Sequence, residues 1–280
     1  SKGGSGKASN IFEIPMPDEF RGKYRGKGAG KKYFIEFEKI ISRAKKANKK
    51  ISAMIVEPII SCGGQIELPE KFLKKCKKIL DKENILLIVD EVQTGFGRVG
   101  ENFWGFQLHD VIPDIVTLGK PMGNGHPIGA VVCTAEISKK FDNGLEFFSS
   151  FGGNPVSCRI ANEVIREIDS RNLQKNALKT GKFLVSELKK LAKKYSIIGN
   201  VRGRGLFIGL ELVDQNLIPE MDKAIYLVNR MKELGVLMSN DGLDKNVIKI
   251  KPPIIFSIDD SKRLIMLLDK VMAEDYMQLN

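Results

Sequence analysis

Two residues of opposite charge follow two predicted strands. Asp90 ends the apolar run ILLIVD, and Lys120 follows the run DIVTLG. Such runs are typical of buried parallel strands, and ligands of open α/β sheets bind beyond the carboxyl ends of these strands. A lysine beside glycines and apolar residues can form an imine with a carbonyl group, and an aspartate can pair with a protonated pyridine nitrogen. The pair therefore indicates pyridoxal phosphate chemistry.

Motifs around this pair resemble one enzyme family over nearly the whole chain. They are DEVQTGFGRVG at residues 90–100, LGKPMGNGHPIGAV at 118–131 and SSFGGNPVSC at 149–158. They are similar to class III, fold type I, pyridoxal-phosphate-dependent aminotransferases. One branch of this class contains the ethanolamine-phosphate and phosphohydroxylysine phospho-lyases. The segments most similar to that branch are RGKYRG at 21–26, SCGGQI at 61–66, VRGRGLFIGLELV at 201–213 and KIKPPIIF at 249–256.

The resemblance implies a role for each residue of a cofactor site. Lys120 would be the Schiff-base lysine and proton carrier, and Asp90 would keep the pyridine nitrogen protonated. Val92 would pack against one face of the ring, and Gln93 would contact the ring hydroxyl. Ser150, where many relatives have threonine, would reach the cofactor phosphate across a dimer interface. Four of these residues have a plain alternative: a surface lysine, a strand-end aspartate, a core valine and a turn serine. The residues flanking Lys120 predict that it is shielded from solvent.

Two departures from the family pattern bear on the substrate. Relatives that act on ω-amino acids have a carboxylate-binding arginine where this chain has Lys249, and a gating glutamate where it has Cys62. A lysine is a point charge that suits phosphate at least as well as carboxylate. Lys249 is equally compatible with a surface position on a strand. The only histidines are His109 and His126, which excludes a histidine-rich metal site, and no metal is predicted.

Strand and helix signals alternate, which predicts an α/β fold. The resemblance makes this fold type I, with part of a large, mostly parallel domain at residues 1–170 and a smaller α/β domain at 171–280. A boundary is expected near 169–180. Family members also have an N-terminal portion with a Gly-Ser-rich phosphate cup, and no counterpart precedes Ser1. The chain is therefore expected to match the C-terminal two-thirds of such an enzyme. The helices expected are 34–47, 69–81, 155–168, 184–194, 221–234 and a last one capped by Ser257 or Asp259.

Composition sets wider bounds. With 280 residues and 42% hydrophobic content, the chain can bury a large core. The net charge of +11 is spread over predicted helix faces, so nucleic-acid binding is not predicted. No apolar run reaches the roughly 20 residues that cross a bilayer, and SKGGSGKASN lacks the core of a signal peptide. The four cysteines are interpreted as free, mostly buried thiols, and the cytoplasm is the expected compartment.

The predicted function is amino transfer from a primary amine to a small oxo acid, by an enzyme expected to be a homodimer. One alternative is a pyridoxal-phosphate-dependent phospho-lyase acting on ethanolamine phosphate or a similar phosphorylated amine. A second alternative is a non-catalytic truncated chain that keeps the fold. The sequence leaves the amino donor, the acceptor and the choice between transfer and elimination open, because both reactions use the same cofactor residues.

Overall fold

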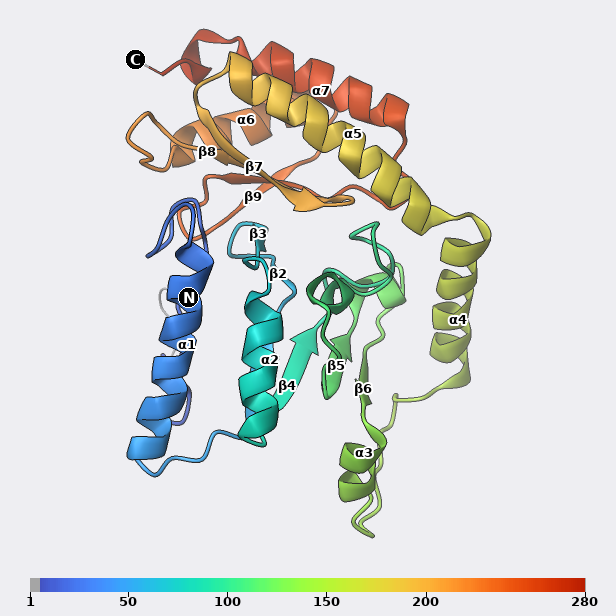
Figure 1. Cartoon of the computed structure of the whole chain (residues 1–280). Helices are drawn as coiled ribbons and strands as arrows, with labels where there is room; N and C mark the ends of the chain where they lie inside the picture. The colour runs from blue at the N-terminus through green and yellow to red at the C-terminus, as the bar shows by residue number, and fades with distance from the viewer. Residues whose placement is uncertain (1–5, 280) are drawn as a thin grey trace.

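The computed structural model describes residues 6–279, in which the strands form two four-stranded sheets and one two-stranded sheet (Figure 1). The first four-stranded sheet has the order β1-β4-β5-β6 and the second has the order β7-β8-β10-β9. Figure 1 shows the first sheet in the lower part of the molecule and the second above it. All strands of the first sheet precede those of the second in sequence.

Three strands of the first sheet are parallel: β1 (Ala53–Val56), β4 (Leu86–Asp90) and β5 (Ile115–Leu118). The fourth strand, β6 (Ala130–Cys133), runs antiparallel to β5. The predicted mostly parallel sheet is confirmed. Both β4 and β5 therefore end at the same edge, and the chain turns back immediately after β5.

Two helices pack against the first sheet: α1 (Ala29–Lys46) and α2 (Phe72–Lys82). The apolar residues of α2 recur at helical spacing, and Leu73, Cys76 and Leu80 are fully buried in a core that includes Leu87 and Val89. Burial of one such aliphatic side chain contributes about 1.5–3 kcal/mol. This core fixes β4 and so determines where Asp90 stands.

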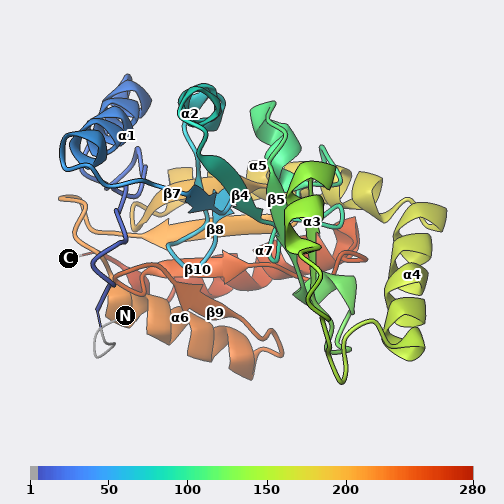
Figure 2. The same ribbon diagram turned by 90° about the horizontal axis from the view of Figure 1, so that it is seen from below.

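The second sheet is antiparallel throughout. Its strands are β7 (Ile198–Arg204), β8 (Phe207–Leu212), β9 (Ser239–Asp241) and β10 (Val247–Ile250). Every residue of β8 is buried. The helices around it are α5 (Leu173–Lys194), α6 (Met221–Glu233) and α7 (Ile258–Met272), and α5 and α7 lie side by side in Figures 1 and 2. The predicted cap of α7 is confirmed, because the Ser257 side chain accepts a hydrogen bond from the Asp260 N–H.

Shorter elements connect these units. The strands β2 (Ile59–Ile60) and β3 (Ile66–Glu67) form the two-stranded sheet, and α3 (Ala135–Phe141) and α4 (Pro155–Ser170) lie between the two larger sheets in sequence. The 3-10 helices are η1 (Gly105–His109), η2 (Lys120–Met122) and η3 (Asp275–Met277). None of the helices in the described part of the chain is both long and apolar enough to cross a membrane.

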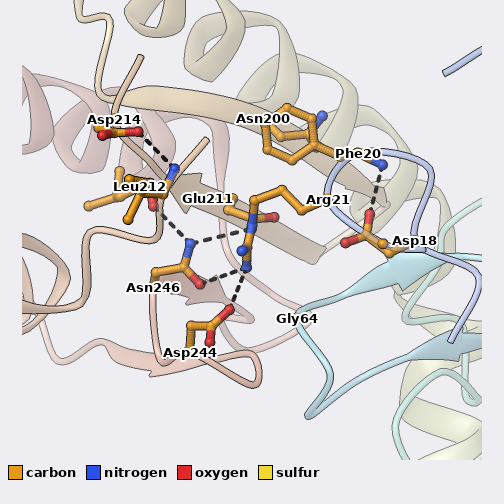
Figure 3. Close-up of polar contacts among 12 residues, drawn as sticks. Asp18, Phe20, Arg21, Gly64, Asn200, Glu211, Leu212, Asp214, Asp244 and Asn246 are labelled. Atoms are coloured by element: carbon orange, nitrogen blue, oxygen red, sulfur yellow. Dashed lines mark hydrogen bonds and ion pairs between the residues drawn. The ribbon is translucent and has the colours of Figure 1, made fainter. Parts of the chain in front are cut away.

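A buried carboxylate joins the N-terminal segment to the second sheet (Figure 3). Glu211 on β8 is 1% exposed and pairs with both Arg21 and Arg202. Arg21 also pairs with Asp244 at 2.9 Å, and Arg202 donates to the backbone oxygen of Gly64 at 2.8 Å. The segment RGKYRG is therefore held against the second sheet by charge-assisted hydrogen bonds.

Two expectations from the sequence are wrong, and two elements of the structure were not predicted. Helix α5 begins at Leu173 and not near residue 184, so only two residues separate α4 from α5. The apolar pattern is weak there because the helix packs closely through a glycine. A Cβ on Gly181 would lie 2.1 Å from the backbone oxygen of Gly205. Strand β7 and helix α3 were not predicted. The cysteines are free as expected, but Cys76 alone is buried, and Cys62 and Cys158 are exposed.

Candidate active site

Asp90 and Lys120 lie at one edge of the first sheet. Asp90 is the last residue of β4, and its partner in the parallel register is Thr117 on β5. Lys120 comes three residues after Thr117 and opens the 3-10 turn η2. The strand order thus places both residues beyond adjacent carboxyl ends, where α/β sheets bind ligands.

A turn after β4 holds the Asp90 carboxylate. Its Oδ1 accepts a hydrogen bond of 2.9 Å from the backbone N–H of Val92. Thr117, on the same face of the sheet, has a buried hydroxyl oxygen with no hydrogen-bond partner among the described residues. A buried polar atom without a partner costs about 1–3 kcal/mol. Because protein atoms enclose this oxygen, the hydrogen bond from Val92 is the contact that orients the Asp90 carboxylate.

Glu91, the residue after Asp90, has a structural role. It is fully buried and accepts hydrogen bonds from the N–H groups of Gly105 and Phe106, at 2.9 and 2.7 Å, and from the Thr94 hydroxyl at 2.8 Å. Burial raises its pKa, and these three donors act against that shift. Glu91 therefore anchors the loop that carries Val92 and Gln93.

The expectation that Lys120 is shielded is wrong. Gly119 is buried, but Lys120 is exposed and has a positive φ of 32°. The turn that follows is tight, because a Cβ on Gly123 would lie 2.0 Å from the backbone oxygen of His126. The φ angle and the tight turn direct the Lys120 side chain away from the sheet. The described residues do not cover it there, so it is exposed to solvent.

His126 supports this turn from the side. Its Nε2 lies 2.7 Å from the hydroxyl oxygen of Ser157, in the first turn of α4. Asn154 caps the same helix by accepting from the Ser157 N–H at 2.9 Å. The lysine turn is thereby tied to α4.

Gln93 and Lys251 form a contact that sequence reasoning missed. Lys251 follows β10, and its Nζ donates to Gln93 Oε1 on the first sheet's loop. Burial lowers the pKa of Lys251 to about 8, and the charges of Lys249, Arg98 and Lys120 act in the same direction. No local sequence pattern signals this contact, since the two residues are 158 positions apart.

Arg98 is a second cation near this contact. It donates to the backbone oxygens of Pro252 and, at 3.3 Å, Leu206. Burial lowers its pKa to about 10. Arg98 thus ties the loop after β4 to the second sheet.

Lys249 and Cys62 lie near each other but have different partners. Lys249 forms an ion pair with Asp241 at 3.0 Å, and Asp241 also accepts from Gln65 Nε2 at 2.9 Å. Cys62 is exposed, and its backbone oxygen accepts from the Gly242 N–H at 3.1 Å. The charge of Lys249 is therefore balanced by a carboxylate of its own sheet.

Ser150 is not brought to this site within one chain. It is exposed, in the segment that joins α3 to α4. Figure 1 shows this segment at the end of the first sheet opposite the carboxyl ends of β4 and β5. Its predicted contact across a dimer interface stays a prediction.

The residues at the sheet edge fit pyridoxal phosphate by their chemistry. Lys120 offers an accessible amine, Asp90 a carboxylate and Gln93 an amide. The acid and the amine stand apart, since Asp90 ends β4 and Lys120 follows the neighbouring strand β5. Such a set can bind an aldehyde covalently at one end of a ring and stabilise a protonated ring nitrogen at the other.

Comparison with known proteins agrees with this chemistry. The family profile described as "Aminotransferase class-III" matches residues 2–272. The "Alanine--glyoxylate aminotransferase 2-like" protein of Drosophila melanogaster is 42% identical over 273 residues, which are 94% of this chain and 55% of that protein. "Ethanolamine-phosphate phospho-lyase homolog 1" of Caenorhabditis elegans is 36% identical over 279 residues, 94% of this chain and 60% of that protein.

Solved structures give the same result. A phospholyase from Arthrobacter in complex with phosphoethanolamine superposes with a TM-score of 0.85 and 36% identity, covering 88% of this chain and 59% of that one. A Bacillus anthracis aminotransferase superposes with a TM-score of 0.86 and 30% identity, covering 95% and 62%. The chain thus spans roughly three-fifths of the length of these relatives.

Proposed function

The chain belongs to the class III aminotransferase family, and on this premise we propose that it transfers an amino group from a primary amine to a small oxo acid. Members of this family use pyridoxal 5'-phosphate, whose ring accepts the electrons released when a bond to the substrate carbon breaks. The observation that carries the proposal is the placement of Lys120 and Asp90 at the carboxyl ends of two paired parallel strands.

The proposed roles follow from the chemistry of each group. Lys120 attaches the cofactor through its amine and, when released by substrate, carries a proton at Nζ. Asp90 pairs with the ring nitrogen and keeps it protonated. Gln93 donates to the ring oxygen, and Val92 packs on one face of the ring.

A homodimer is part of the proposal, with Ser150 contributing its hydroxyl to the phosphate site of the partner subunit. Support comes from exposed apolar side chains on β6, on α3 and in the segment that joins α3 to α4. Clusters of this kind mark interaction surfaces. They include Val131, Val132, Phe141, Phe147, Phe148 and Phe151.

We further propose residues 1–170 and 171–280 as the two domains, supported by the break between α4 and α5 at Arg171 and Asn172, with one four-stranded sheet before it in sequence and the other after it. The cytoplasm is the proposed compartment, supported by four free cysteines. Relatives from Arabidopsis thaliana and Homo sapiens are named as mitochondrial, so imaging of a tagged protein would distinguish the two locations.

A second candidate function is elimination of phosphate from a phosphorylated amine. It is favoured by similarity to the Arthrobacter phospholyase solved with phosphoethanolamine. Lys251, whose hydrogen-bond partner is the Gln93 amide, also suits a dianionic group. Lys249 would add a second cation once it separates from Asp241.

One assay separates the two reactions. With ethanolamine phosphate as substrate, an aminotransferase stops after one half-reaction until pyruvate is added, because the amino group stays on the cofactor. A phospho-lyase releases inorganic phosphate and ammonia continuously without an acceptor, because elimination restores the cofactor. We expect a pyruvate-dependent product with simple primary amines. Acceptor-independent phosphate release would replace this proposal with the second candidate, and absence of both products in a folded, cofactor-loaded sample would favour a non-catalytic chain.

A further inference from the structure

Lys251 connects the two halves of the site. It lies just after β10, on the second sheet, and its Nζ donates to Gln93 Oε1, on the loop after β4. The same Nζ lies 5.4 Å from the centroid of the Phe207 ring, which is fully buried on β8. An ammonium over an aromatic face is attracted by the ring electrons. Both contacts therefore hold the charged end of the side chain.

This ammonium has an unusual set of neighbours. Its hydrogen-bond partner is an uncharged amide, and the nearby carboxylate of Asp241 is paired with Lys249 at 3.0 Å. Burial lowers the pKa of Lys251 to about 8, with further lowering by Lys249, Arg98 and Lys120 and an opposing effect of Asp241. A half-buried cation with other cations in its vicinity is costly unless an anion compensates its charge.

The contact also fixes which way the Gln93 amide points. An ammonium has three donors and no acceptor, so it can contact only the oxygen of an amide. The oxygen of Gln93 must therefore face Lys251. Its Nε2 is left as a donor for another acceptor.

We propose that Lys251 is a positioning residue, which holds the Gln93 oxygen so that the amide N–H group faces the ring oxygen of the cofactor. The ammonium of Lys251 also adds a positive charge near Lys120. This inference rests on the proposed function, because it takes the bound ring to be pyridoxal phosphate. A cation at this place favours the unprotonated form of the bond between Lys120 and the cofactor, since like charges disfavour each other. A charge carried by the second sheet would in this way lower the pKa of the linkage that Lys120, on the first sheet, forms with the cofactor.

The contact is testable without cofactor. Trace acetylation across a pH series, read by mass spectrometry, gives the titration midpoint of each lysine. Lys251 is expected to titrate near pH 8. Gln93→Glu should raise that midpoint by about one unit or more, because a carboxylate favours the ammonium. Exposed Lys232 on α6 is the internal control and should not respond. A Lys251 midpoint equal to that of Lys232, or one unmoved by Gln93→Glu, would overturn the inference.

The effect on the cofactor is tested by its visible absorption band. In Lys251→Met the pH midpoint of the band should rise by about one unit, because a neighbouring cation is lost. Lys251→Arg should restore most of the shift, and Lys232→Met should match the parent chain, with circular dichroism reporting the fold of each. An identical midpoint in Lys251→Met and the parent chain would overturn the inference while leaving the proposed function intact. If the parent chain forms no band, the proposed function fails, and the acetylation experiment alone decides the role of Lys251.

Discussion

Replacing Asp90 by asparagine is expected to reduce turnover by about three orders of magnitude, or roughly 4 kcal/mol in the activation barrier. The amide cannot supply the negative charge that keeps the ring nitrogen protonated. The fold should remain, because the asparagine oxygen can still accept from the Val92 N–H, as Asp90 Oδ1 does at 2.9 Å. Turnover and the thermal unfolding midpoint would be measured on the same preparation.

The matched control is Asp110→Asn, which removes an exposed carboxylate that pairs with Lys74 on the surface. It should leave turnover and stability close to those of the parent chain, since exposed ion pairs contribute about 0–1 kcal/mol. Near-normal turnover in Asp90→Asn would show that this aspartate does not serve the ring nitrogen.

The largest effect on stability is expected at Glu211, and its Ala substitution should lower the free energy of unfolding by about 3–5 kcal/mol. The reason is that Arg21 and Arg202 would both lose the buried carboxylate with which they pair. Arg21 would keep Asp244, but Arg202 would keep only uncharged partners, the Gly64 backbone oxygen and Asn200. Denaturant unfolding, followed by circular dichroism, measures the change.

Glu233→Ala serves as the control for that substitution. Glu233 also pairs with an arginine, Arg230, but its side chain is 62% exposed. Its replacement should cost less than about 1 kcal/mol. A loss at Glu211 no larger than the loss at Glu233 would mean that the buried network does not hold the N-terminal segment in place.

The ends of β4 and β5 could be predicted from sequence because each strand is a short apolar run followed by a turn. That pattern placed Asp90 and Lys120 at one edge, and the class III family and its fold type I architecture are confirmed. The cap of α7 was predictable for a similar reason, since a serine followed by acids is a local signal.

Other features depend on contacts distant in sequence and left no local pattern. The first part of α5 presents Thr180 and Gly181 to the interior, which weakens its apolar periodicity. Strand β7 contains Gly199, Gly203 and three polar residues, so it does not alternate like a half-buried strand. The exposure of Lys120 depends on a turn geometry that apolar neighbours do not reveal. The Lys251 contact joins two sheets and could be found only in the structure.

Attachment of the cofactor is the central claim, and borohydride trapping tests it most directly. The chain is mixed with pyridoxal phosphate, reduced and digested, and the modified peptide is identified by mass spectrometry. The account predicts loss of the visible band on reduction and a stable adduct on Lys120. The adduct should be absent in Lys120→Ala and unchanged in Lys139→Ala and Lys140→Ala, which remove exposed lysines on α3. An adduct on another lysine, or an unaltered band in Lys120→Ala, would contradict it.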